Sequence, residues 1–178
     1  MSELKNITPK KLLWLDLEMT GLNPAKHKII EVAAVITDWD FNELATFEAI
    51  VKQPKSVLAN MDDWPRKQHT ASGLLAKVGE GIDSSAAEQE LCNLIGAHFG
   101  SGPALLAGNS IHTDRQFIRV EWPKVEAKLH YRMLDVTAWK VVMVGKYGIE
   151  FSKKDTHRAL DDIRESIAEL QFYLNHKY

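Results

Sequence analysis

The sequence predicts an α/β protein built on a mixed five-stranded sheet, with its first three strands antiparallel and with helices flanking the sheet. Three short apolar segments follow one another near the N-terminus with brief connections, which is the pattern of an antiparallel meander. Helical and strand patterns then alternate, which indicates a mixed sheet. The 178 residues suit one compact domain with a sizeable core. We therefore expect a single domain, 1–178, in which residues 1–10 form a flexible tail.

The expected strands are apolar runs closed by turn signals. The first begins at Leu12 and ends before the turn Thr20-Gly21-Leu22-Asn23-Pro24. The expected strands cover residues 12–19, 29–36, 45–51, 104–107 and 131–135.

Helices are expected where apolar residues recur at helical spacing or where capping residues mark a start. Ser85 and Glu88 have the spacing of a capping box, a helix ends before Pro123, and Gly148 follows another helix at its C-cap side. The last helix should bury a stripe made of Ile163, Ile167, Leu170 and Leu174. The expected helices cover residues 57–64, 72–78, 85–99, 113–121, 136–147 and 156–175.

The composition is that of an ordinary globular protein, with 45% apolar and 26% charged residues and a formal net charge of −2. A protein that wraps long nucleic acid usually has a strong basic excess, so this charge argues against a large electrostatic footprint but allows a local phosphate site. Cys92 is the single cysteine, which excludes an intrachain disulfide and fits a reducing compartment. Residues 1–11 lack the pattern of a secretory signal, and no apolar run approaches the ~20 residues of a membrane helix. We therefore expect a cytoplasmic protein with no membrane partner.

Two carboxylates, Asp16 and Glu18, close the first expected strand. Because they are two residues apart, they point to the same face of a strand. Buried like charges repel and are costly to desolvate, so a strand would not carry this pair for stability. A divalent cation that prefers hard oxygen ligands, Mg²⁺ or Mn²⁺, removes that cost. The pair is a metal-site candidate, and the alternative is an exposed edge strand whose polar side happens to carry two acids.

Two further carboxylates stand on other elements. Asp114 follows the fourth strand at an expected helix start, where an acidic residue also favours the helix dipole without any other function. In the last helix Asp162 borders the buried stripe, roughly 100° from Ile163, whereas Asp161 lies about 160° from Ile163 and should face solvent. Asp162 is therefore the candidate of this pair. The alternative is a rim carboxylate that pairs with Arg158 or Arg164.

His157 lies near the start of the last expected helix, close in sequence to Asp162. Together with Asp16, Glu18 and Asp114, these residues make four acids on three separate elements and one histidine. That set matches the needs of two-metal phosphoryl transfer, in which one metal activates a water and the other stabilises the leaving oxygen. A histidine can accept the proton of that water.

The D-x-E pair, Asp114 and an H-x(4)-D spacing from His157 to Asp162 follow one another along the chain. In these motifs the sequence resembles the DEDD exonuclease superfamily, in its His-containing branch. Within the branch it is most similar to the oligoribonuclease family, in pieces that run in order through nearly the whole chain. These pieces are Trp14–Leu22, Met61–Trp64, His69–Leu74, Gly108–Ser110, His130–Arg132, Leu134–Val136 and Asp161–Ser166.

The resemblance implies a ribonuclease H-like fold and a homodimer. It implies hydrolysis of very short RNA, dinucleotides above all, from the 3′ end to 5′-mononucleotides, with two divalent ions, Mg²⁺ or Mn²⁺. By carry-over of the motifs, the metal ligands would be Asp16, Glu18, Asp114 and Asp162. His157 would be the general base.

The resemblance also implies base contacts. Leu22 would be the wedge between the two bases of a dinucleotide, Trp64 would stack on a base, and His69 would lie near the substrate. An aromatic face suits a base contact that tolerates any sequence.

A second implied group would cap the 5′ phosphate of the substrate and so limit its length. The cap would consist of Ser110, Arg132 and Thr137, and Tyr131 would reach the site of the partner subunit. A dinucleotide offers few phosphates to neutralise, which fits the weak net charge.

Some features depart from the family pattern or stay open. Ile111-His112-Thr113 precedes Asp114 where the family more often ends in Gly-Gln, and Thr137 stands where Ser is expected. His112 would either perturb the metal site or point outward. Met133 and Trp139 are expected in the core or in a dimer interface. The alternative functions are another exonuclease of the same branch, acting on DNA or on tRNA 3′ ends, and a non-catalytic RNA-binding module on the same fold.

Overall fold

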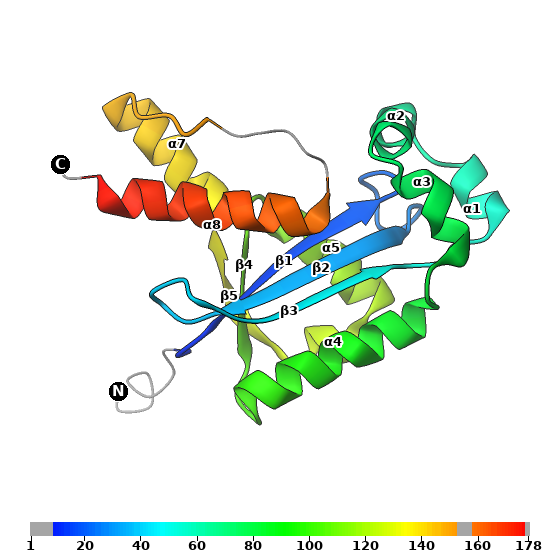
Figure 1. Ribbon diagram of the computed structural model, residues 1–178, viewed down its shortest axis with the longest axis horizontal. Coiled ribbons are helices and arrows are strands. Elements are labelled where there is room, and N and C mark those ends of the chain that lie inside the picture. The colour runs from blue at the N-terminus through cyan, green and yellow to red at the C-terminus, as the bar shows by residue number, and fades with distance from the viewer. Residues whose placement is uncertain (1–8, 153–157, 177–178) are drawn as a thin grey trace.

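The structure is a computed structural model that describes residues 9–152 and 158–176 (Figure 1). A five-stranded sheet runs through it in the order β3-β2-β1-β4-β5. β2 is antiparallel to both β1 and β3, whereas β4 is parallel to both β1 and β5. This arrangement confirms the predicted mixed sheet. The strands are β1 Leu12–Met19, β2 Ile29–Thr37, β3 Glu43–Ile50, β4 Ala104–Gly108 and β5 Leu129–Asp135.

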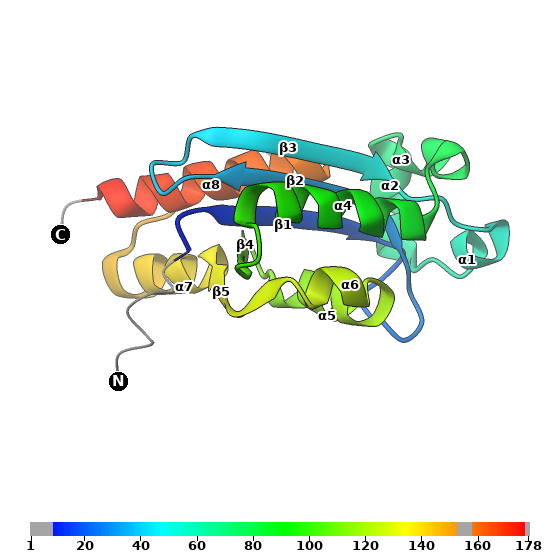
Figure 2. The ribbon, with the colours of Figure 1, turned by 90° about the horizontal axis from the view of Figure 1, so that it is seen from below.

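Helices cover both faces of the sheet. In Figure 2, α4 lies in front of the sheet and α8 lies behind it. Among the described helices, none combines the length and apolar character that a membrane crossing requires. The helices are α1 Lys55–Ala59, α2 Asp63–Ala71, α3 Leu74–Lys77, the 3₁₀ helix η2 Val78–Glu80, α4 Ser84–Phe99, α5 His112–Glu121, α6 Pro123–Glu126, α7 Val136–Tyr147 and α8 Ala159–Asn175.

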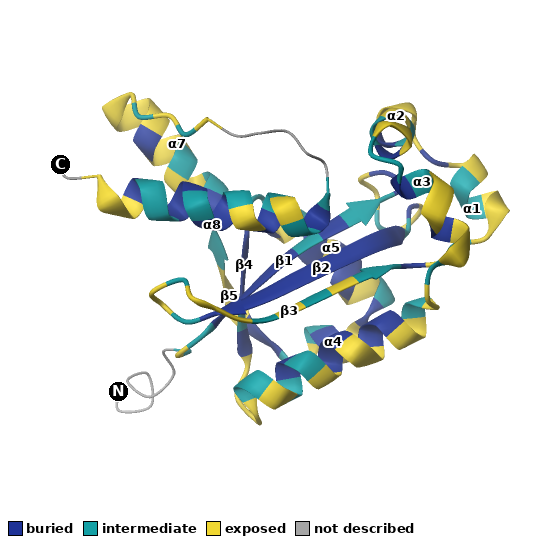
Figure 3. Ribbon diagram, viewed as in Figure 1, coloured by how far each residue is buried: buried dark blue, intermediate teal, exposed yellow. Residues whose placement is uncertain are grey.

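β1 is the central strand, and its alternating side chains enter two separate cores. Leu13, Leu15 and Leu17 pack in the core that also contains residues of α4 and α5. Leu12 and Trp14 pack in the core that α8 covers. β2 beside it is buried along its whole length (Figure 3). β1 and β2 therefore form the buried centre of the sheet, and burial decreases only toward the end of β1.

The predicted strands agree with the structure to within two residues at each end. The predicted helix 57–64 is wrong, because the chain breaks between α1 and α2. Met61 is buried in that break, and the backbone N–H of Asp62 donates to the carbonyl of Thr20 at 3.0 Å. This bond ties the segment to the end of β1, so α2 starts later and runs on to Ala71. The short helix α6 was not predicted.

Two further details of the helix predictions are wrong. Glu88 does not close a capping box, because its carboxylate accepts the backbone N–H of Lys124 at 2.8 Å. Leu174 is half exposed, whereas Tyr173 is buried and donates its hydroxyl to Glu169. α8 also packs against α7.

The expected tail, residues 1–10, falls largely outside the described residues. Of its described part, the carbonyl of Pro9 accepts the indole N–H of Trp39 at 2.7 Å.

Candidate active site

Asp16 and Glu18 lie at the end of β1, on the face that α8 covers, because they continue the alternation that starts at Leu12 and Trp14. The alternative of an exposed edge strand is wrong for this pair, because β1 is the central strand of the sheet and both side chains are half-buried, although the pairing with β4 ends at Trp14. Directly opposite Glu18 on β2 stands Glu31, which is fully buried. Residues paired across neighbouring strands share a face, so three carboxylates meet at this end of the sheet.

α8 brings Asp162 to these carboxylates. One oxygen from each of Asp16, Glu18 and Asp162 lies within 4.8 Å of the others. Asp161 is exposed, as the helical spacing predicts. The two arginines considered as partners of Asp162 instead form ion pairs with glutamates of the sheet: Arg158 with Glu31 and Glu48, and Arg164 with Glu43.

Asp114 enters the site from the first turn of α5 and is buried. β4 pairs with β1 only as far as Trp14, so the strand beyond that point lacks a partner on this side. Asp114 fills the gap, because its carboxylate accepts the backbone N–H of Leu17 at 3.0 Å. The helix-dipole explanation is therefore incomplete: the side chain reaches out of its helix and bonds to the strand that carries the acidic pair.

Burial and mutual repulsion raise the pKa values of these acids. Burial raises the pKa of Asp16 well above its usual range, and the carboxylates of Asp114, Glu18 and Asp162 raise it further. Burial, then Asp162 and Glu31, raise the pKa of Glu18 to about 8. Burial raises the pKa of Asp114 to about 7, even though the N–H of Leu17 lowers it. Such a cluster is unfavourable when fully ionised, and a divalent cation relieves the repulsion.

The donor set fits a hard divalent cation. Carboxylate oxygens are the ligands that Mg²⁺ and Mn²⁺ prefer, and the three-residue cluster offers them at mutual distances of up to 4.8 Å. The sequence left open whether His112 perturbs the metal site or points outward. In the structure its side chain is exposed, and its Nδ1 lies 3.5 Å from a carboxylate oxygen of Asp135 rather than at the cluster.

A cavity of about 210 Å³ opens directly above the carboxylates. Leu22 and Trp64 line it with side chains that are 72% and 63% exposed. His69 lines it too, but it is buried: its Nε2 bonds to the carbonyl of Met19 at 2.9 Å, and its Nδ1 lies 3.8 Å from Glu18. The carbonyl can only accept, so Nε2 carries the hydrogen. The structure thus brings these three predicted residues to the acidic cluster.

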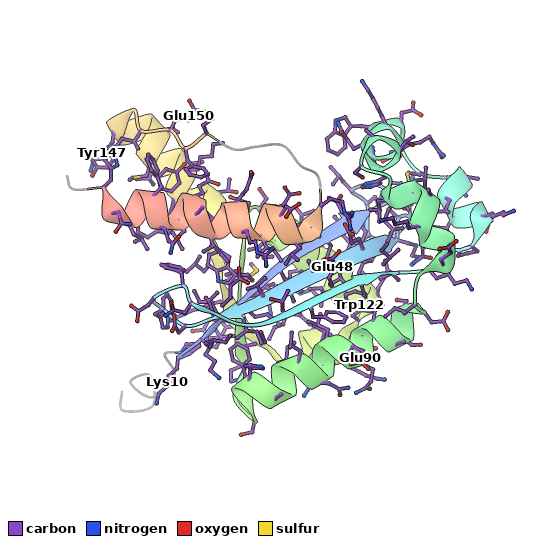
Figure 4. All side chains as sticks on the ribbon, viewed as in Figure 1. Lys10, Glu48, Glu90, Trp122, Tyr147 and Glu150 are labelled. Atoms are coloured by element: carbon purple, nitrogen blue, oxygen red, sulfur yellow. The ribbon has the colours of Figure 1, made fainter. Side chains whose placement is uncertain are left out.

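Ser110 and Thr137 line a second cavity, of about 630 Å³, between the end of β4, α7 and α8. Glu150, labelled in Figure 4, lies on the same cavity. The two hydroxyl oxygens are 3.1 Å apart, and the backbone N–H groups of both residues donate to one carboxylate oxygen of Asp135. Ser110 also adopts a left-handed backbone conformation, with φ 48°. Asp135 therefore holds Ser110 and Thr137, two of the proposed cap residues, close together.

Tyr131 and Arg132 are exposed on β5, the edge strand. The guanidinium of Arg132 lies 5.2 Å from the centre of the Tyr131 ring. Neither residue lines the two cavities above. His157 lies outside the described residues, so its predicted role stays a prediction.

Sequence reasoning missed Glu31, and it considered Arg158 only as a possible partner of Asp162. The signal for Glu31 was a single acid inside an apolar run, Ile29–Ile36, that forms a wholly buried strand. A lone buried carboxylate needs a partner, and that partner is 127 residues away in sequence.

Carboxylates clustered on the central strand of a mixed sheet, with acids from two helices beside them, form the kind of site that two-metal phosphoryl transfer requires. The exonuclease family model RNase_T matches residues 13–170. The chain therefore belongs to the RNase_T exonuclease family.

Curated relatives place the chain further within that family. It is 49% identical over 167 residues to the oligoribonuclease of Francisella tularensis subsp. tularensis (strain WY96-3418), which covers 91% of this chain and 93% of the relative. It is 43% identical over 177 residues to the oligoribonuclease of Vibrio cholerae serotype O1 (strain ATCC 39315). This match covers 94% of this chain and 96% of the relative. The predicted resemblance to oligoribonucleases is confirmed.

Solved structures share the fold. E. coli Exonuclease I in complex with a dT13 oligonucleotide matches with a TM-score of 0.70 at 16% identity. The match covers 93% of this chain but only 41% of that one. Exonuclease I from Methylocaldum szegediense matches with a TM-score of 0.68 at 18% identity. This match covers 89% of this chain and 39% of that one.

Proposed function

We propose that this protein is a 3′→5′ exoribonuclease that hydrolyses short oligoribonucleotides, especially dinucleotides, to 5′-mononucleotides. The observation that carries the proposal is the acidic cluster at the base of a small cavity with apolar walls. A volume of about 210 Å³ suits the end of a nucleic acid strand rather than a long duplex. The oligoribonuclease relatives, which match over almost their whole length, support the choice of short RNA.

The roles of the acidic residues follow from their places. Asp16, Glu18 and Asp162 would hold divalent ions, with Asp114 completing the set. The ions would supply a Lewis acid and lower the pKa of a bound water. The protein's own contribution is to hold the carboxylates on three elements, β1, α5 and α8, that meet at one end of the sheet. His157 is proposed as the general base that removes the proton of the attacking water.

The exposed apolar side chains suit the bases of the substrate. Leu22 and Trp64 stand at the cavity that contains the carboxylates, so a base could stack on the indole while Leu22 separates it from its neighbour. Ser110, Thr137 and Arg132 are proposed to receive the 5′ phosphate. The paired hydroxyls of Ser110 and Thr137 offer donors suited to a phosphate.

We also propose that two copies of the chain associate. β5 is an open edge of the sheet, and the adjoining surface of β5 and α7 is apolar. Its exposed apolar residues are Tyr131, Met133, Trp139, Val141 and Val142. Of the two possibilities for Met133 and Trp139, this exposure favours the interface. Sedimentation equilibrium of Val142→Glu, compared with the wild type, tests the dimer: a monomeric variant supports this surface, and an unchanged dimer excludes it.

The activity is tested with 5′-labelled RNAs of two, five and fifteen nucleotides and with a DNA dinucleotide, each with Mg²⁺ and with chelator. Metal-dependent loss of the RNA dinucleotide, faster than that of the longer chains, is the expected result. Preference for the fifteen-nucleotide RNA or for DNA would assign the chain to another branch of the exonucleases. RNA binding without cleavage, unaffected by chelator, would favour the binding module.

A further inference from the structure

A second charged group lies beside the acidic cluster, on the same face of the sheet, and has no role in the proposed chemistry. It consists of Glu31 on β2, Glu48 on β3 and Arg158 at the N-cap of α8. Figure 4 shows Glu48 on β3, next to the first turn of α8. The group joins two strands of the sheet to the start of the helix that carries Asp162.

Glu31 is fully buried and uses both carboxylate oxygens on the start of α8. Its Oε1 accepts the Nη2–H and Nε–H groups of Arg158 at 2.8 and 3.2 Å. Its Oε2 accepts the backbone N–H of Ala159 at 3.4 Å. α8 has no cap from its own side chain at this end, so Glu31 supplies the cap from the neighbouring strand.

The same geometry separates Glu31 from the metal-binding acids. It stands opposite Glu18 in the strand pairing, yet it is not one of the residues whose oxygens converge at the cluster. Its oxygens are directed at α8 instead. Glu31 is therefore placed to hold a helix rather than an ion.

Asp162 depends on that helix start. Its backbone N–H donates to the carbonyl of Arg158 at 3.0 Å, which closes the first turn of α8. A shift of Arg158 therefore moves the turn that presents the carboxylate of Asp162. Ligands of a metal site are commonly oriented by such supporting contacts, and removal of a supporting contact typically costs about 10–100-fold in metal affinity or activity.

We propose that Glu31 and Arg158 are positioning residues that fix the first turn of α8, so that Asp162 meets Asp16 and Glu18 at the distance a divalent ion requires. The proposal rests on the proposed function for the identity of the reaction. The positioning itself concerns the ion alone.

Arg158→Met gives the sharpest test, because two explanations predict opposite results. If Arg158 acted only through its charge, its removal would strengthen binding of a cation to the nearby carboxylates. If it positions Asp162, its removal weakens binding. Titration of the full-length, metal-free protein with Mn²⁺ in a calorimeter should show affinity lowered by about tenfold or more. Unchanged or tighter Mn²⁺ binding would overturn the proposal.

Glu31→Gln is the complementary variant, since the amide keeps an oxygen for Ala159 but loses the ion pair. It should also weaken Mn²⁺ binding. Glu43→Gln is the matched control, because it breaks another pair between α8 and β3, that of Glu43 with Arg164 at 3.1 Å, away from the helix start. Mn²⁺ affinity should stay within about twofold of the wild type in this control. An equal loss in the control would mean that any ion pair of α8 has this effect, which contradicts the proposal.

Kinetics separate positioning from a general loss of structure. With a 5′-phosphorylated RNA dinucleotide, Arg158→Met should lower kcat and leave KM nearly unchanged, and Arg158→Lys should recover part of kcat because it retains a cation for the two glutamates. Melting temperatures in chelator show whether each variant is folded. A lower melting temperature with normal Mn²⁺ affinity would mean a structural role only. If the wild type binds Mn²⁺ but cleaves no RNA, the proposed function fails while the Mn²⁺ titrations still decide the positioning.

Discussion

The buried acids should make the metal-free protein less stable as the pH rises. The pKa of Glu18 is raised from 4.5 to about 8 in the folded protein. Between these two values the folded state keeps a proton that the unfolded chain has released. Unfolding therefore releases protons, and the free energy of unfolding falls as the pH rises through this window.

The size of the effect follows from the shift. A difference of about 3.5 pKa units, from 4.5 to about 8, corresponds to about 5 kcal/mol for Glu18. Its side chain is only 17% exposed, so solvent screening reduces this little. Asp16 and Asp114 respond to the same repulsion, so their contributions overlap with that of Glu18 rather than add to it. For a chain of 178 residues, 5 kcal/mol corresponds to a fall in the melting temperature of about 10–20 °C.

The fall in melting temperature can be measured by circular dichroism during thermal unfolding. The protein is unfolded in chelator at several pH values from about 5 to about 8. Other groups also titrate in this range, so the comparison is with Glu18→Gln, which resembles the protonated form. The fall should be clearly smaller in that variant. Added Mg²⁺ or Mn²⁺ should raise the melting temperature most at the high end, because the ion binds the deprotonated ligands. If the wild type and Glu18→Gln had parallel pH profiles, the inference that Glu18 is protonated in the metal-free protein would be wrong.

Three further outcomes follow from the site. Asp162→Asn should lower kcat by at least about a hundredfold, because it removes a proposed metal ligand and not merely a contact that supports one, whereas Asp161→Asn should retain most activity; equal losses would contradict the positions found on α8. Gly21→Ala should raise KM several-fold with a smaller change in kcat, because a Cβ there would overlap the ring of His27 and displace the loop that carries Leu22; an unchanged KM would argue against a role for that loop. Arg132→Ala should weaken binding of a 5′-phosphorylated dinucleotide by about tenfold, the cost of one charge-assisted hydrogen bond, and an equal effect on the unphosphorylated dinucleotide would exclude the phosphate contact.

Local sequence patterns predicted the fold where each element has its own signal. Apolar runs between turn residues located the strands, and helical spacing located most of the helices. The patterns failed where a contact distant in sequence decides the structure. The break before α2 depends on the bond from Asp62 to Thr20, and the carboxylate of Glu88 bonds to Lys124 rather than to its own helix. No local pattern contains such information.

The same limit applies to the site. The inward face of Asp162 was predictable, because it depends only on the period of α8 and on the apolar residues beside it. The bond from Asp114 to Leu17 was not, because it fills a gap left where β4 diverges from β1. The ion pair of Glu31 with Arg158 was not predictable either, since it joins residues 127 positions apart.

These observations together explain why the site lies where it does. Most side chains at the centre of a sheet are apolar, because the desolvation of a buried charge is unfavourable unless the charge is paired and hydrogen-bonded. At the end of β1 this chain places Asp16, Glu18 and Glu31 on one face of the sheet, and Arg158 forms an ion pair with Glu31 at 2.8 Å. Glu31 also caps the start of α8, the helix that carries the further carboxylate of Asp162. The arginine thus compensates the negative charge of Glu31. The repulsion among Asp16, Glu18 and Asp162 remains, and at that position a divalent ion and the phosphate of a substrate can be held together.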